Sequence, residues 1–461
     1  MPSPTTRSRL VRQGLLAALL LGSGPTLPAQ ADELSSLRQR DYTQIDRHAL
    51  AAGDQATRTL GGLVAYLVET ARDDADKARA IFRWITENIE YDAAGFFSGQ
   101  YGDLSAEGVL KRRKAVCSGY AELFSRMAKL AGLEVISIRG YVKDVLHQNG
   151  EPFADTNHDW SAVRLAGQWY LLEPTWGAGG LDDTGQFKKH FSERHFLVDP
   201  GQLAYTHFAA DPRWHVADTP SLAAFNAQIR PYEAYHRYGV EARETRQQLT
   251  AQCASQTLTF NTPGNVYLRA SLERDGHVLS QQTLLQRHGN DNQLLVAAPA
   301  AGNYTLRLYA KEANAPGHVF EQVVHYTLQF PAGSAFQFPV DYVTFREHGG
   351  TLQTLLAGTL SLGALTHFSL DLPGAVEIAV ARDAEHWIKL DKRGDHFEGD
   401  VEIAGATTVY AKFDDTAPDH LAVLSYSAVT EPVTQAFTPC QALPAGVQLA
   451  SNEGQAPAAP R

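Results

Sequence analysis

Apolar residues recur at intervals of three and four positions in residues 76–89, DKARAIFRWITENI. This spacing places them on one stripe of a helix, and charged or polar residues fill much of the other face. The pattern therefore predicts an amphipathic helix that packs against a core. Its inward residues are Ala78, Ile81, Phe82, Ile85 and Ile89.

A second helical pattern covers residues 117–130 and has Gly132 as its stop signal. Residues 135–142 then alternate as a strand does. Residues 160–173 read as a hairpin that turns at Ala166-Gly167. Helices followed by antiparallel strands predict an α+β domain.

Short alternating runs dominate the chain after residue 257, and turn signals separate them. Recurrence of this kind is typical of antiparallel β-sandwiches, and the pattern restarts after Phe338-Pro339 with YVTFRE. The tail is rich in Ala, Pro, Gly and Gln, and is expected to be disordered. The predicted organisation is an α+β domain at 32–217, a connector at 218–252 with a charged helical segment at 241–249, β-sandwiches at 253–335 and 336–442, and a tail at 443–461.

Residues 1–31 have the pattern of a cleavable signal peptide. Three arginines precede a short apolar run, and small residues follow at Ala29-Gln30-Ala31. The alternative, a membrane anchor, needs about 20 apolar residues, and this run is much shorter. We therefore expect a periplasmic or secreted protein with no membrane span after cleavage.

The formal net charge is −11, and removal of the three signal arginines would make it −14. A negative chain is a poor ligand for nucleic acid or for an anionic membrane surface. No glycine-rich phosphate loop or nucleotide fingerprint occurs, so no cofactor is predicted. The histidines at 190, 195 and 207 form no recognised ligand spacing, and no metal is predicted.

Three cysteines occur, and an odd number in an oxidising compartment leaves at least one thiol outside any intramolecular bridge. Cys253 and Cys440 lie at the start of the first predicted sandwich and the end of the second, so one disulfide could join them. Cys117 instead begins a predicted helix, where the helix dipole and free N–H groups would stabilise a thiolate. The plain alternative for Cys117 is a small buried apolar residue.

His158 and Glu173 strengthen the reactive interpretation of Cys117. If Leu165 pairs with Gln168 across the hairpin, Glu173 becomes the diagonal neighbour of His158 on the same face. A carboxylate there would orient the imidazole, which would serve as base for a thiolate on the adjacent helix. The backbone N–H of Cys117 would be the first oxyanion donor.

Three stretches together resemble the transglutaminase-like superfamily, and most specifically its kyphoscoliosis-peptidase-like branch. They are RRKAVCSGYA, the His-Asp-Trp at 158–160, and WYLLEPTWGAGG. The segments KARAIFRWITENIEYDA and FLVDPGQLAYTHFAADPRWHV, and the two β-regions, resemble other parts of that branch. The resemblance covers nearly the whole chain after residue 31.

The resemblance implies an α+β papain-like (transglutaminase-like) core followed by two all-β immunoglobulin-like sandwiches. It also implies acyl transfer by a Cys-His-Asp triad, in which Cys117 is the nucleophile and His158 the base. The third residue departs from the family, because Glu173 stands where Asp is usual. Asp159 is the fallback orienting group, but as the neighbour of His158 in a strand it should face the other way.

We expect an exported enzyme that acts on protein or peptide amides through Cys117, His158 and Glu173. Its reaction would be hydrolysis, deamidation or cross-linking, and cell-wall peptides are one possible substrate class. The alternative is a catalytically weak or inactive scaffold that binds protein partners through its β-sandwiches. The basic run from Lys111 to Lys114 either is a solvated loop or favours a thiolate and acidic substrates.

Overall fold

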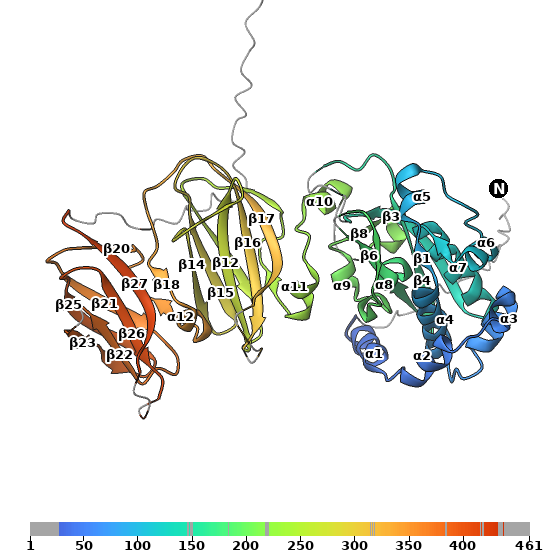
Figure 1. Ribbon diagram of the computed structural model, residues 1–461, viewed down its shortest axis with the longest axis horizontal. Helices are drawn as coiled ribbons and strands as arrows, with labels where there is room; N and C mark the ends of the chain where they lie inside the picture. Colours follow the sequence, from blue (N-terminus) through green and yellow to red (C-terminus); the bar gives the residue numbers. More distant parts are fainter. Residues whose placement is uncertain are drawn as a thin grey trace, which may run out of the picture. The chain divides into compact units, whose positions relative to one another are not determined.

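The computed structural model describes residues 27–431 and Phe437, except 145–146, 148–150, 183, 217–220, 314, 316, 318, 383–384, 415 and 417–418 (Figure 1). Residues 1–26 of the predicted signal peptide, Cys440 and the predicted tail at 443–461 lie outside this range. Contacts group the chain into two compact units. One comprises the described residues up to Ile138 with Asp159–Asp199, and the other comprises the described residues of Arg139–His158 and those from Pro200 onward.

Helices dominate the chain up to residue 130. They are α1 (Leu27–Gln39), α2 (Thr43–Leu50), α3 (Leu60–Leu67), α4 (Asp74–Asn88), α5 (Ala93–Ser98), α6 (Ala106–Arg112) and α7 (Cys117–Leu130), with a short 3-10 turn η1 (Ala56–Arg58). The short strands β1 (Glu90–Tyr91) and β2 (Lys114–Ala115) pair in parallel.

Helix α4 confirms the stripe predicted at residues 76–89. All five predicted inward residues are fully buried. The helix has Asp73 as its N-cap, and the carboxylate of Asp73 accepts a hydrogen bond from the N–H of Asp76 at 2.9 Å. Such an N-cap satisfies one of the first N–H groups of the helix. Helix α7 also has its predicted bounds, and Gly132 follows it with a φ of +80°.

A four-stranded sheet follows α7 in the order β5-β4-β3-β8. Its strands are β3 (Glu134–Val142), β4 (His158–Leu165), β5 (Gln168–Leu172) and β8 (His207–Ala209). The hairpin turns at Ala166 and Gly167, which both have positive φ, and Leu165 pairs with Gln168. The register predicted from the sequence is therefore confirmed.

Smaller elements surround this sheet in the sequence. They are α8 (Pro174–Ala178), β6 (Gly179–Leu181), β7 (Phe187–Lys189), η2 (Glu193–His195), α9 (Pro200–Leu203), η3 (Pro212–Trp214), α10 (Leu222–Ala227) and α11 (Glu233–Arg237).

The first β-region has two sheets, in the orders β10-β17-β16-β12-β13 and β14-β15-β11-β9. Their strands are β9 (Glu241–Ala242), β10 (Gln248–Thr250), β11 (Ser255–Asn261), β12 (Val266–Arg274), β13 (His277–Leu279), β14 (Thr283–His288), β15 (Asp291–Ala297), β16 (Gly302–Glu312) and β17 (Glu321–Phe330). Apolar residues of both sheets form one buried cluster, as in a β-sandwich.

The charged segment at 241–249 was predicted to be helical, and this prediction is wrong. Strands β9 and β10 occupy it and pair with β11 and β17. Leu249 is buried, and the side chain of Gln247 donates to the carbonyl of His325 at 2.6 Å. Pairing with distant strands outweighs the helix propensity of the charged residues.

The second β-region also has two sheets, ordered β18-β27-β26-β22-β23, with β20 beside β27, and β19-β21-β25-β24. Its elements are β18 (Val340–Asp341), α12 (Val343–Glu347), β19 (Thr351–Leu352), β20 (Thr359–Ser361), β21 (Leu365–Asp371), β22 (Glu377–Ala381), β23 (Trp387–Lys389), β24 (Asp391–Arg393), β25 (His396–Glu402), β26 (Thr407–Lys412) and β27 (Leu421–Val429).

The run YVTFRE was predicted to be a strand, but it forms the short helix α12. Phe345 is fully buried, and a Cβ on Gly350 would lie 2.3 Å from its ring. A five-residue run with one buried aromatic residue is compatible with a strand or a helix, so the sequence pattern cannot distinguish them. Packing around Phe345 decides that the run forms a helix. Among the described residues, no helix is long and apolar enough to cross a membrane.

Candidate functional site

Cys117 is the first residue of α7, and its side chain is half-buried. The position is fixed by close packing, because a Cβ on Gly119 would lie 2.6 Å from the Cβ of Ala115. The hydroxyl of Tyr120 also donates to the carbonyl of Ile89 at 2.7 Å. The first N–H groups of a helix have no partner within the helix and favour a negative charge. The predicted location of Cys117 is therefore confirmed.

His158 is the first residue of β4, and its side chain is 7% exposed. The preceding residue, Asn157, holds the strand to β3 in three ways. Its N–H donates to the carbonyl of Gly140 at 3.0 Å, its Oδ1 accepts from the N–H of Val142 at 2.7 Å, and its Nδ2 donates to the carbonyl of Val142 at 3.0 Å. This anchoring restricts where the imidazole can lie.

Glu173 follows β5 and is fully buried. It was predicted to be a strand end, and in the structure it is the N-cap of α8. Its Oε1 accepts from the N–H groups of Thr175 at 2.9 Å and Trp176 at 3.2 Å, and its own N–H donates to the carbonyl of His195 at 2.9 Å. Gly177 lets α8 approach α4, since a Cβ there would lie 2.7 Å from the ring of Phe82. Hydrogen bonds thus hold both the backbone and the side chain of Glu173 in place.

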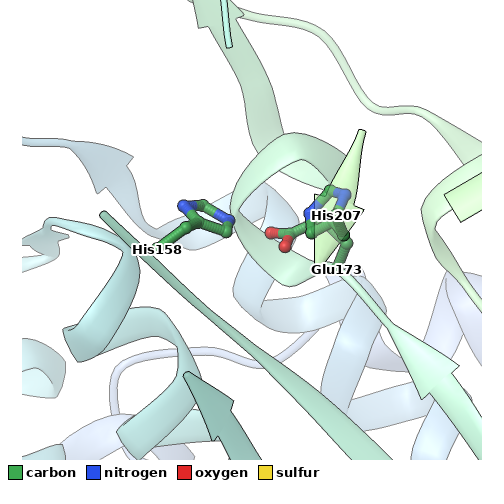
Figure 2. A group of neighbouring side chains, drawn as sticks. All are labelled: His158, Glu173 and His207. Carbon is green, nitrogen blue, oxygen red and sulfur yellow. The ribbon is translucent and has the colours of Figure 1, made fainter. Parts of the chain in front are cut away.

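The sheet brings His158 and Glu173 together at one edge. One ring nitrogen of His158, one carboxylate oxygen of Glu173 and one ring nitrogen of His207 all lie within 4.8 Å of one another. Figure 2 shows the carboxylate of Glu173 pointing toward the ring of His158. We call these three buried residues the sheet-edge cluster.

His207 is the residue of this cluster that the sequence analysis did not select. It begins β8, pairs with Val142 of β3, and is 3% exposed. Its ring is 5.6 Å from that of His158 and nearly perpendicular to it. In the sequence it lies 49 positions after His158, so no local spacing could reveal the contact; only its place at the start of a strand was available as a signal.

Asp159, the fallback orienting group, follows His158 in β4 and is half-buried. Consecutive strand residues leave opposite faces of a sheet. The cluster around His158 contains Glu173 and not Asp159. Glu173 therefore remains the predicted carboxylate partner of the imidazole.

The basic run beside Cys117 is partly neutralised. Arg112 and Lys114 lie 3.5 and 3.6 Å from the carboxylate of Asp92. The guanidinium of Arg113 lies 4.6 Å from the ring centroid of Trp84, and burial lowers its pKa. Much of the positive charge therefore has local partners near the start of α7.

The cysteines differ in chemical state. Cys117 is a free thiol, and Cys253 takes part in a disulfide. The predicted partner of Cys253, Cys440, lies outside the described residues. A thiol reagent would therefore find Cys117 as the free thiol of the described part of the chain.

Comparison with protein families finds two matches in this chain. A family described as the transglutaminase-like superfamily matches residues 61–174, and one described as the KY-like, immunoglobulin-like domain matches residues 222–338. The first range contains Cys117, His158 and Glu173. The second begins within the stretch treated above as a connector and continues through the first β-region.

Three curated relatives are similar to parts of this chain. The chain is 29% identical to human kyphoscoliosis peptidase over 339 residues, which are 70% of this chain and 50% of that protein. It is 29% identical to the mouse kyphoscoliosis peptidase over 274 residues, with 59% and 40% coverage. Hillarin of Drosophila melanogaster is 30% identical over 215 residues, with 43% and 26% coverage.

The chain spans about half the length of the curated relatives that it matches first. Its core and its first β-region each match a family of their own, in the order that the sequence predicted. The chain therefore contains a transglutaminase-like domain followed by a KY-like, immunoglobulin-like domain, and it is similar to kyphoscoliosis peptidases over much of its length.

Proposed function

We propose that this protein is a cysteine-nucleophile acyl-transfer enzyme that acts on protein or peptide amides. The observation that carries the proposal is that a ring nitrogen of His158 and a carboxylate oxygen of Glu173 lie within 4.8 Å of each other, in a domain whose nucleophile candidate begins a helix. A buried carboxylate beside an imidazole can fix its orientation and stabilise its protonated form. Glu173 supplies that carboxylate in place of the usual Asp.

The proposed reaction begins when His158 accepts the proton of the Cys117 thiol. The thiolate attacks the amide carbon, and the negative oxygen that forms is stabilised by the N–H of Cys117. His158 returns the proton to the leaving nitrogen, the C–N bond breaks, and a thioester remains on Cys117. Water then gives a carboxylic acid, whereas an amine gives a new amide.

The acceptor and the amide determine the net reaction. Attack on a main-chain amide followed by water is peptide hydrolysis. Attack on a glutamine side chain releases ammonia, and water or an amine then completes deamidation or cross-linking. We propose an exported location, periplasmic or secreted, in which cell-wall peptides would be accessible substrates. Detection of the mature N-terminus after residue 31, by mass spectrometry of protein expressed with its full N-terminus, would test the export proposal.

The pH dependence of iodoacetamide labelling tests the site. If His158 takes the proton of Cys117, labelling of Cys117 should proceed well below pH 8. A cysteine without such a base has a pKa of about 8.5 and would label slowly there. His158→Ala should slow this labelling, and Cys117→Ala should abolish both labelling and any amide turnover while the fold is retained. His190→Ala, at an exposed histidine, is the matched control.

Slow labelling that is unchanged by His158→Ala would contradict the proposal. That result would favour the second candidate function, a scaffold that binds partners through the β-regions. The two appended sandwiches and the Glu173 departure motivate this candidate. Pull-down with residues 222–431 would then be the next measurement, after circular dichroism had established that this fragment folds.

A further inference from the structure

His207 gives the sheet-edge cluster a third potential metal ligand. The strand order β5-β4-β3-β8 places the end of β5 beside the start of β4, and the end of β3 beside the start of β8. The start of β4 is also tied to the end of β3 through Asn157. Glu173, His158 and His207 therefore reach one edge of the sheet from three strand ends.

Two imidazoles and a carboxylate are a ligand set that suits Zn²⁺ better than Mg²⁺ or Ca²⁺. Zinc sites have metal–ligand distances of about 2.0–2.2 Å in tetrahedral geometry, which places ligand atoms roughly 3.4 Å apart. The three ligand atoms here lie within 4.8 Å of one another, so small side-chain rotations would close the set around an ion. All three side chains are at least nine-tenths buried.

Neighbouring groups already hold two of the ligands in place. The Nδ1 of His207 lies 2.9 Å from the hydroxyl of Thr206, and when Nδ1–H donates to this hydroxyl the lone pair of Nε2 is left for a metal ion. Two N–H groups hold Oε1 of Glu173. Outer-shell hydrogen bonds of this kind orient the ligands of protein metal sites.

We propose that His158, Glu173 and His207 bind Zn²⁺, and that the bound ion inhibits Cys117. The inhibitory part rests on the function proposed above. Neutral imidazole has one nitrogen that accepts a proton and one that carries hydrogen. Once zinc occupies the accepting nitrogen, the other nitrogen of His158 carries hydrogen and cannot take the proton of Cys117. The site would thus switch off when zinc is available.

Calorimetric titration of the Cys117→Ala protein with ZnCl₂ at pH 7.5 tests the binding itself. Removal of the thiol excludes it as the ligand and makes the test independent of catalysis. We expect one ion per chain. His207→Gln in this background should weaken zinc binding at least about tenfold, while His190→Ala should leave it unchanged. A thermal melt verifies that each variant is folded.

Absence of zinc binding by Cys117→Ala would overturn the proposal, as would equal affinity in the His207→Gln variant. The inhibitory part is measured with Cys117 present, as the ratio of iodoacetamide labelling rates with and without ZnCl₂ in each protein. ZnCl₂ should lower the labelling rate at least about fivefold in the parent chain, so that the ratio is about 0.2 or less, and should lower it much less in His207→Gln. Equal ratios in both would show that zinc acts elsewhere and would overturn the inhibitory part alone.

Discussion

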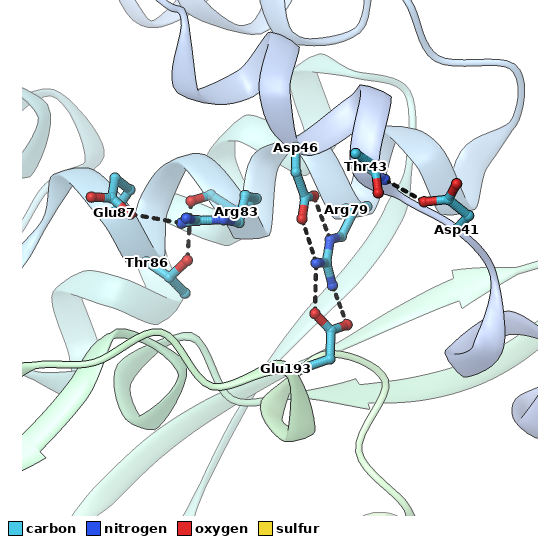
Figure 3. Close-up of polar contacts among 8 residues, drawn as sticks. All are labelled: Asp41, Thr43, Asp46, Arg79, Arg83, Thr86, Glu87 and Glu193. Carbon is cyan, nitrogen blue, oxygen red and sulfur yellow. Dashed lines mark hydrogen bonds and ion pairs between the residues drawn. The ribbon is translucent and has the colours of Figure 1, made fainter.

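Two buried polar regions of this protein satisfy their charges in different ways. The first is the arginine cluster, in which Arg79 of α4 lies between Asp46 and Glu193 (Figure 3). Its guanidinium is 3% exposed and donates to both oxygens of each carboxylate. Burial alone would lower the pKa of Arg79, but the hydrogen bonds and charges of Asp46 and Glu193 outweigh it and raise the pKa.

The second region is the end of the four-stranded sheet, where Lys143 follows β3. Its ammonium is fully buried and donates to backbone carbonyls, those of Phe225 and Gln228 at 3.0 Å and that of Ile229 at 3.4 Å. Burial, and then repulsion from Arg230, lower its pKa to about 7. The ammonium of Lys143 is therefore bound by the dipoles of backbone carbonyls, whereas the guanidinium of Arg79 is bound by two charged carboxylates.

This difference separates a region with fixed charges from one with a cation that titrates near neutral pH. Opposite charges in fixed geometry keep Arg79 charged over the whole accessible pH range and hold η2 to α2 and α4. Lys143 is held by backbone carbonyls, and with its pKa lowered to about 7 it can lose its proton near neutral pH.

The largest expected effect concerns Glu173. Glu173→Gln keeps an oxygen that can cap α8 but removes the negative charge beside His158. Any amide turnover should fall about a thousandfold or more, because loss of the corresponding carboxylate in serine-type triads has an effect of this order, whereas labelling of Cys117 should slow toward the rate of an ordinary thiol. Glu173→Asp restores the charge and should recover part of the rate. Equal rates in the parent chain and Glu173→Gln would show that the charge of Glu173 has no role in the reaction.

Arg79→Met should give the next largest effect, a loss of about 3 kcal/mol in the free energy of unfolding. The substitution leaves two carboxylates facing each other without a cation, and breaking a buried pair typically costs this much. Arg79→Lys keeps the charge but not the planar fork, so we expect a smaller loss. Urea denaturation measures both, and similar losses for the two variants would show that charge alone holds the cluster.

The cluster also reaches the site. Glu193 begins η2, whose last residue, His195, accepts the N–H of Glu173. Labelling of Cys117 in folded Arg79→Met should therefore be slower than in the parent chain. An unchanged labelling rate would show that the cluster supports stability alone.

Lys143 gives a prediction about pH. Its pKa is lowered from 10.5 to about 7 on folding, so the unfolded chain binds more protons between these values and stability rises with pH across the window. The stabilising contribution is complete above about pH 10.5 and is lost as the pH falls through about 7. Lys143→Met should remove this dependence, so its stability relative to the parent chain should fall by about 1–3 kcal/mol between pH 6.5 and 9.5. A pH-independent difference would contradict the lowered pKa.

The smallest expected effects come from the two partners of Arg79 and from Glu87. The side chain of Asp46 is 21% exposed and that of Glu193 is 55% exposed. Asp46→Asn should therefore cost about 1–2 kcal/mol, and Glu193→Gln less than about 1 kcal/mol. Glu87→Gln breaks the part-buried pair with Arg83 in the same helix, in which Glu87 is 44% exposed, and should cost less than about 0.5 kcal/mol. A larger loss for Glu193→Gln than for Asp46→Asn would reverse the assignment of the stronger partner.

Local pattern was sufficient for much of the fold and for part of the site. The stripe of α4, the start of α7 at Cys117 and the hairpin register all follow from short-range rules of spacing and turn geometry. The register in turn predicted the approach of His158 and Glu173, since a two-residue turn fixes which residues are neighbours. These features need no information from distant parts of the chain.

Other features depend on residues far apart in the sequence. The strands at 241–250 form because β11 and β17 offer edges for pairing, and α12 forms around one buried phenylalanine. His207 joins His158 and Glu173 because β8 pairs with β3. The sequence by itself determined α4, α7, the hairpin at 160–173 and the candidate nucleophile, base and carboxylate. The tertiary structure decided the second histidine and the opposite pKa shifts of Arg79 and Lys143, because sheet order and burial depend on which distant groups surround each residue.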